Sequence, residues 1–91
     1  MEARRRYVVI TTRVRDDIPP DVLAAHRERL RALLAEGRVV ASGGFAEGGG
    51  LIVYAAADLA EVEALAREDP FVVHGTHTYV IRTWLQDLGS L

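Results

Sequence analysis

The stretch RVVASGGFAEGGGLIVYAAA, residues 38–57, lies near the centre of the chain and gives the clearest indication of its fold. It holds two apolar runs, Arg38 to Ala46 and Leu51 to Ala57, which are typical of β-strands. Between them lies Glu47-Gly48-Gly49-Gly50, and a short glycine-rich joint is typical of a hairpin, because glycine adopts turn conformations that other residues avoid. The stretch therefore predicts two antiparallel strands.

A helix is predicted on each side of this hairpin. The earlier helix follows Pro19-Pro20, since proline is tolerated in a first helical turn, and runs to about Glu36, with Gly37 as its left-handed terminator. The later helix begins at Asp58-Leu59-Ala60-Glu61, which has capping-box spacing, and stops before Pro70. Each helix has an apolar stripe, formed by Leu23, Leu30, Leu33 and Leu34 in the first and by Leu59, Val62, Leu65 and Ala66 in the second.

The outermost predicted elements are strands over residues 7–14 and about 77–85, which are rich in β-branched and aromatic residues. The resulting order, β-α-β-β-α-β, is that of the α+β, ferredoxin-like fold, with a four-stranded antiparallel sheet and two helices on one face. A chain of 91 residues is too short for two domains, so we expect one domain over residues 1–91 with its core at about 7–85.

The composition excludes several classes of protein. Eleven arginines, no lysine and thirteen acidic residues give a net charge of −2, so no positive field favours a nucleic acid. The run Tyr7 to Ile10 is too short for a membrane span or a signal peptide. No cysteine is present, which excludes disulfides, and we expect a cytoplasmic protein.

The last strand predicts a homodimer, because it is apolar on both faces. Tyr79 and Ile81 alternate with Val80 and Trp84, while two helices cover only one side of the sheet. A second copy of the same sheet is the simplest cover for the other side, since it forms a twofold, self-complementary contact.

Two residues break the local rules of the predicted helices and are candidates for function. His26 lies on the apolar stripe of the first helix, and Asp69 continues the stripe of the second helix at its negative end. Right-handed crossovers make the two helices antiparallel, so both residues are expected at one rim of the domain. There a carboxylate would orient an imidazole for general acid–base chemistry. The structural alternatives are a core histidine and a turn aspartate beside Pro70.

Other polar residues near this rim have weaker signals. The hydroxyl of Ser42 could contact a substrate, and Gly43 allows a ligand close to the backbone, although a plain bulge also explains this pair. His26, His74 and His77 suggest a metal site, but neither later histidine lies on a predicted helix at a ligand spacing. We therefore expect neither a metal nor a cofactor.

At these positions the chain resembles the YCII-related family. The resemblance rests on Tyr7-Val8-Val9, His26, the run from Gly37 to Gly43, Asp69-Pro70-Phe71 with Gly75, and Ile81-Arg82-Thr83-Trp84, and it covers roughly residues 7–85. It implies a dimeric α+β barrel with an active site built around a histidine and an aspartate, here His26 and Asp69. Family members include dehydrochlorinases of chlorinated aromatic diols. The short glycine hairpin and His74 depart from the family pattern.

Two functions remain open from the sequence. The first is a small enzyme of lyase or isomerase type, in which His26 moves a proton on a small aromatic or carbonyl-bearing ligand and Asp69 orients the imidazole. The expected contacts to that ligand come from Tyr7, Ser42, Gly43, Phe71 and His74. The second is a ligand-binding or assembly module without chemistry, in which His26 and Asp69 form a buried structural pair. An open pocket beside His26 would favour the enzyme.

Overall fold

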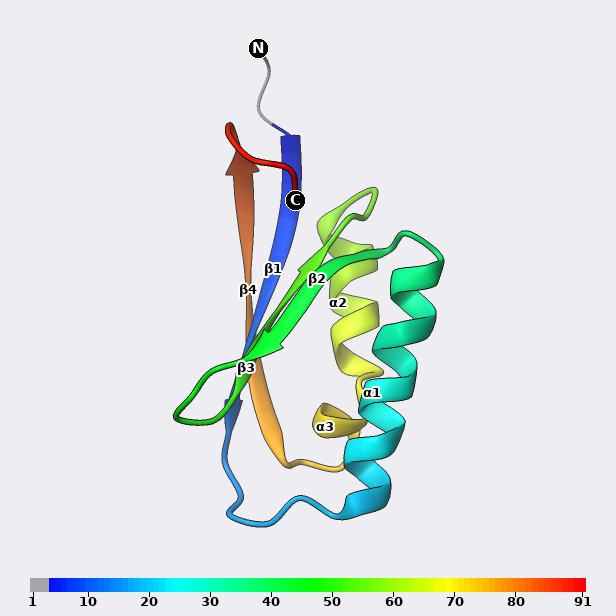
Figure 1. The fold of residues 1–91 in the computed structure, drawn as a ribbon, viewed down its shortest axis with the longest axis vertical. Coiled ribbons are helices and arrows are strands. Elements are labelled where there is room, and N and C mark those ends of the chain that lie inside the picture. The colour runs from blue at the N-terminus through cyan, green and yellow to red at the C-terminus, as the bar shows by residue number, and fades with distance from the viewer. Residues whose placement is uncertain (1–3) are drawn as a thin grey trace.

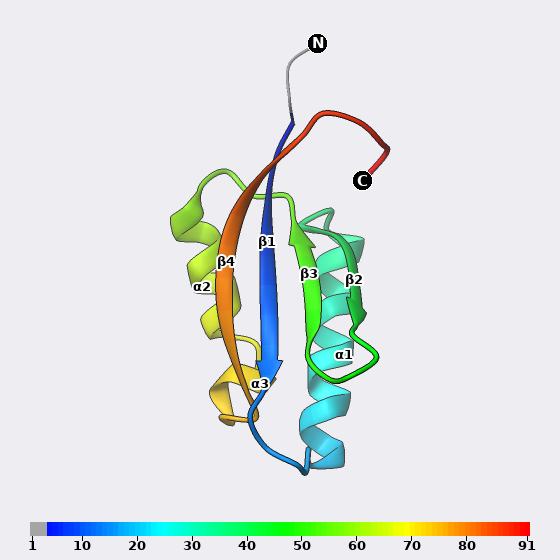
Figure 2. The same cartoon turned by 90° about the vertical axis from the view of Figure 1, so that its left-hand side faces the viewer.

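A computed structural model describes residues 4–91 of the chain. The elements in chain order are β1 (Arg4–Arg13), α1 (Pro20–Ala35), β2 (Val39–Gly44), β3 (Gly50–Tyr54), α2 (Leu59–Arg67), α3 (Pro70–Val73) and β4 (His77–Gln86). The strands form one antiparallel sheet in the order β2-β3-β1-β4. Figures 1 and 2 show the helices gathered on one side of this sheet. The predicted α+β, ferredoxin-like fold is confirmed, with the short helix α3 as an addition that the sequence did not predict.

The predicted hairpin is formed by β2 and β3, with Ser42 opposite Ile52 and Gly44 opposite Gly50. Its turn depends on Gly49, which has a φ of 75°. A Cβ atom on Gly49 would lie 2.3 Å from the carbonyl oxygen of Thr11 in β1, a separation that real Cβ atoms do not adopt. The hairpin thus packs against β1 by backbone contact, which brings two glycine-rich segments close to the end of β1.

The helix ends follow the predicted capping chemistry. Gly37 has a φ of 77°, and the amides of Gly37 and Arg38 donate to the carbonyls of Leu34 and Leu33, so α1 ends in a Schellman motif. At the start of α2, the Asp58 carboxylate accepts a hydrogen bond from the Glu61 amide at 2.9 Å. These caps place the two helices in fixed register against the sheet.

The core lies between the helices and one face of the sheet. Tyr7, Val9, Ile52 and Tyr54 point from β1 and β3 toward buried residues of the helices, which include Leu33, Val62, Leu65 and Ala66. The predicted stripe of α1 was wrong at Leu34, which is 54% exposed, whereas Val22 is buried. The buried face of α1 follows a line through Val22, His26, Leu30 and Leu33, because an ideal helix has 3.6 residues per turn.

The opposite face of the sheet is apolar, and none of the helices within residues 4–91 covers it (Figure 1). A shallow cavity of about 490 Å³ lies on this face, and Val80 nearby in β4 is 59% exposed. The residues around the cavity are Val8, Ile10, Leu51, Val53, Arg82, Thr83, Trp84 and Leu91. The sequence prediction that β4 is apolar on both faces is therefore confirmed. No helix within residues 4–91 is long and apolar enough to cross a membrane.

Substituting Gly49 and Gly37 by alanine separates backbone strain from steric conflict in the hairpin. Both residues have positive φ values, but only Gly49 has an atom within 4 Å of an added Cβ. We expect Gly37→Ala to lower the free energy of unfolding by about 1 kcal/mol. Gly49→Ala should lower it by more than about 3 kcal/mol, because Thr11 must also move. Urea denaturation measures both, and equal losses would contradict the close hairpin packing.

Candidate active site

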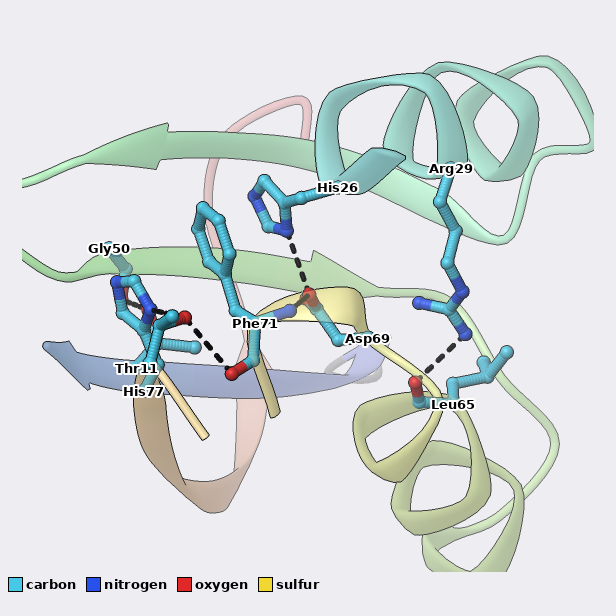
Figure 3. A network of polar contacts seen from close by, with 9 residues as sticks. Thr11, His26, Arg29, Gly50, Leu65, Asp69, Phe71 and His77 are labelled. Atoms are coloured by element: carbon cyan, nitrogen blue, oxygen red, sulfur yellow. Dashed lines mark hydrogen bonds and ion pairs between the residues drawn. The ribbon is translucent and has the colours of Figure 1, made fainter. Parts of the chain in front are cut away.

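His26 and Asp69, 43 positions apart in the sequence, form a direct pair in the structure. Nδ1 of His26 lies 2.8 Å from Oδ1 of Asp69. The imidazole is 13% exposed and the carboxylate only 3% exposed, so the pair stands at the inner wall of the domain (Figure 3). Whatever the charge of the imidazole, a carboxylate without a proton can only accept, so Nδ1 is the donor in this contact. When the imidazole is neutral, its lone pair is therefore on Nε2.

Asp69 is held in place by the start of α3. Asp69 is the N-cap residue of that helix. The Oδ1 atom that contacts His26 also accepts a hydrogen bond from the Phe71 amide at 2.9 Å. Pro70 occupies the first helical position, where its missing amide hydrogen has no cost. The prediction that Asp69 continues the stripe of α2 was wrong, because α2 ends at Arg67 and the chain turns before α3.

Three rings form a continuous stack beside this pair. The His26 and Phe71 rings have centroids 3.7 Å apart with an interplanar angle of 10°. Phe71 also stacks on His77, at 4.1 Å and 11°. In Figure 3, Phe71 lies between the two imidazoles. The short helix α3 thus fixes both the carboxylate and the aromatic ring that support His26.

The stack borders a cavity of about 270 Å³ between α1, the glycine hairpin and the end of β1. Four of the predicted site residues line it: His26, Ser42, Gly43 and Phe71. Asp69 contacts the cavity only through His26. The remaining lining residues are Thr11, Leu23, Arg27, Leu30, Gly44, Gly49, Gly50, Leu51, Ile52 and His77. The cavity has the size expected for a small ligand and combines apolar walls with a few polar groups.

Two of the predicted contact residues lie elsewhere. Tyr7 is buried in the core opposite Tyr54, and the residue of β1 that reaches the cavity on the same face is Thr11. His74 ends α3 and is exposed, outside the residues that line the cavity. Tyr7 lies four residues before Thr11, and His74 lies three residues before His77, which does line the cavity. Sequence patterns do not resolve shifts of this size.

His77, which the sequence suggested only as part of a weak metal site, is a lining residue of the cavity. It is 5% exposed and lines the cavity at the beginning of β4. Burial lowers its pKa below the usual value of 6.5; the nearby His26 and Arg13 act in the same direction, and Asp69 acts against them. Strand alternation could have found this residue, because His77 shares a face with Tyr79 and Ile81.

Arg29 holds α1 against α2 one turn beyond His26. Its guanidinium donates to the Leu65 carbonyl at 2.9 Å and lies 3.5 Å from the Glu68 carboxylate. Tyr54 is fully buried beneath this region, and burial raises the pKa of its hydroxyl, with Arg29 opposing that shift. These contacts fix the spacing between α1, which carries His26, and α2, which is followed by Asp69.

Metal ligation has no obvious centre at this site. Over residues 4–91, no group of three or more histidine, cysteine, aspartate or glutamate side chains is arranged to hold a metal ion. His26 and His77 are separated by the Phe71 ring, so they cannot share one ion at the bond length of about 2 Å that imidazole requires.

Comparison with known proteins identifies a solved structure of similar fold and a family. The structure is similar to the 5-chloro-2-hydroxyhydroquinone dehydrochlorinase of Burkholderia phenoliruptrix AC1100, solved in complex with 2,5-dihydroxybenzoquinone. The TM-score is 0.66 and the sequence identity 19%, over 87% of this chain and 92% of that chain. No curated protein sequence is significantly similar to this one. The model of the YCII-related domain matches residues 6–85. With its fold and almost its whole length matched in this way, the chain belongs to the YCII-related family.

Proposed function

We propose that this protein is a small lyase-type enzyme in which His26 transfers a proton and Asp69 orients the imidazole. The observation that carries this proposal is the 2.8 Å contact between Nδ1 and the carboxylate, made by a histidine that also lines a cavity. A pair sealed in the core would have indicated a structural role. Here the second nitrogen of the ring remains available to a ligand.

The chemistry follows from the direction of that hydrogen bond. Nε2 of neutral His26 takes a proton from an acidic position of the ligand, and the resulting imidazolium is stabilised by the Asp69 carboxylate. In an elimination, the electrons left behind form a double bond, and the leaving group departs with its bonding pair. The burial of Asp69 strengthens its attraction to the imidazolium, because water screens the two charges poorly.

The cavity supports a small aromatic or carbonyl-bearing substrate. Phe71, Leu30 and Ile52 supply apolar surface, and the Ser42 hydroxyl and the backbone at Gly43 supply polar contacts. Arg27 adds a positive charge at the exposed edge, where an anionic group of the ligand would be favoured. The protein with the same fold is named for its action on 5-chloro-2-hydroxyhydroquinone, a chlorinated aromatic compound with three hydroxyl groups, which agrees with this substrate class.

A binding or assembly module without chemistry is the second candidate function. It is favoured by one observation: Oδ1 of Asp69 also caps α3, so the carboxylate has a structural task that explains its presence. In that case His26 would support the cap and the aromatic stack alone. The two functions differ in what the loss of the imidazole does to turnover and to stability.

Replacing His26 by glutamine tests the acid–base role. A substrate is first identified by thermal shift among chlorinated hydroquinones and small carbonyl compounds, since a ligand raises the melting temperature. With 5-chloro-2-hydroxyhydroquinone, turnover is followed by chloride release. We expect His26→Gln to lower kcat/KM by about 10²- to 10⁴-fold, because proton transfer loses its base.

The exposed His74 provides a matched control for this substitution. His74→Gln should keep kcat/KM within about twofold of the unmodified chain, since His74 does not line the cavity. Unchanged turnover in His26→Gln would contradict the proposed function. The binding module would be favoured if the unmodified chain and His26→Gln both bind the ligand without turnover, and if His26→Gln has a much lower melting temperature.

We also propose that the protein is a homodimer that pairs the open faces of two sheets. The exposed apolar surface around Val80 and Trp84 supports this, because water contact with such a face is unfavourable and a twofold copy is complementary to itself. The small size of the chain adds to the argument, since one thin core buries little apolar surface.

Val80→Glu and Val73→Glu test the dimer with equal chemistry on opposite sides of the molecule. Val80 is 59% exposed on the open face, and Val73 is 65% exposed on α3. In sedimentation at micromolar concentration, the unmodified chain and Val73→Glu should have about twice the mass of one chain. Val80→Glu should shift toward the monomer, because the charge would be buried between sheets. A monomeric unmodified chain would contradict the dimer.

A further inference from the structure

His77 contacts the cavity in a way that the acid–base mechanism does not use. It stacks on the face of Phe71 that is remote from His26, and it is only 5% exposed. Its Nδ1 lies 2.9 Å from the Thr76 hydroxyl, while no partner for its Nε2 occurs within residues 4–91. Nε2 is not fully buried, and His77 lines the cavity, so we infer that Nε2 can be reached from it.

The Thr76 hydroxyl fixes which nitrogen of His77 carries the proton. That hydroxyl has one hydrogen, and it lies 3.1 Å from the Phe71 carbonyl, which can only accept. If the hydrogen went to His77 instead, the hydroxyl and carbonyl oxygens would face each other without a proton between them. Both contacts are satisfied only when Nδ1–H of His77 donates to the Thr76 oxygen. Nε2 then carries a lone pair.

His77 keeps this neutral form near pH 7. Burial, and then the charges of His26 and Arg13, lower its pKa, and Asp69 on the other side of the stack only partly opposes them. The group presented to the cavity is therefore a hydrogen-bond acceptor and not a cation. It would not attract an anionic group of a ligand, a task that the exposed Arg27 can perform.

We propose that His77 is a specificity-determining residue of this site, whose Nε2 accepts a hydrogen bond from a hydroxyl or N–H group of the ligand. The inference rests on the proposed function in that the cavity binds a small molecule and His26 presents the lone pair of its Nε2 to it. His26 and His77 lie on opposite faces of Phe71, so the ligand needs two donors on well-separated atoms, as in a ring with 1,4-hydroxyl groups. A ligand without the second donor would leave a buried acceptor unpaired, which is strongly unfavourable.

Hydroquinone and 4-fluorophenol are matched probes for this acceptor. They have nearly the same shape, but fluorine replaces the second hydroxyl group and cannot donate. In NMR titrations without oxygen, the unmodified chain should bind hydroquinone about tenfold more tightly than 4-fluorophenol. His77→Phe keeps an aromatic ring on Phe71 and removes the acceptor, so this preference should fall to about onefold. The exposed His74→Phe is the control and should retain the tenfold preference.

Two further variants test the positioning role of Thr76 and keep the test valid if His77→Phe does not fold. Thr76→Ser retains the hydroxyl and should keep the preference for hydroquinone. Thr76→Val removes it, which frees the proton to move to Nε2. The ligand hydroxyl would then have to accept from Nε2–H, so the preference should become smaller. Equal preferences in the Thr76→Ser and Thr76→Val proteins would contradict the argument from the hydroxyl.

The outcomes separate this inference from the proposed enzyme. A tenfold preference that persists in His77→Phe, or an unmodified chain that binds neither probe or both probes equally, would contradict the role of His77. By contrast, a preference that depends on His77 while turnover is independent of His26 would contradict only the acid–base proposal.

Discussion

One carboxylate oxygen, Oδ1 of Asp69, accepts hydrogen bonds from two parts of the chain that the fold brings together. The Phe71 amide at 2.9 Å fixes the start of α3, and Nδ1 of His26 at 2.8 Å fixes the imidazole on α1. The oxygen is almost fully buried, so leaving either donor unpaired there would be costly. The turn that begins α3 and the contact between His26 and Asp69 thus depend on the same oxygen atom, so a change in one is expected to disturb the other.

The ferredoxin-like topology makes this contact possible. Its two crossovers run the main helices antiparallel, so the early turns of α1 lie beside the segment that follows α2. Arg29 fixes the helices in that position through the Leu65 carbonyl. The glycine hairpin then approaches β1 closely enough to close one wall of the cavity, because Gly49 has no side chain. Apolar packing therefore supplies the frame, and a few polar contacts define the site.

Much of this arrangement follows from sequence patterns, and its failures have physical reasons. The pairing of His26 with Asp69 was predictable because topology alone sets which helix ends are neighbours. The four-residue helix α3 was not, since a single turn has no periodicity to detect. Placing Tyr7 instead of Thr11 at the cavity was an error along β1, where both residues share one face and only the register with β3 distinguishes them. The last strand was predicted to begin at His77, as it does, but the sequence did not indicate that this side chain lines the cavity.

The central claim is that Asp69 holds His26 with its proton on Nδ1 and its lone pair on Nε2. Nitrogen-15 NMR of the histidine rings, at a pH where His26 is neutral, measures this directly. A protonated Nδ1 and an unprotonated Nε2, in one tautomer, are the predicted result. A proton on Nε2, or an averaged mixture of the two tautomers, would contradict the account, because the ring could then not present a base to the cavity.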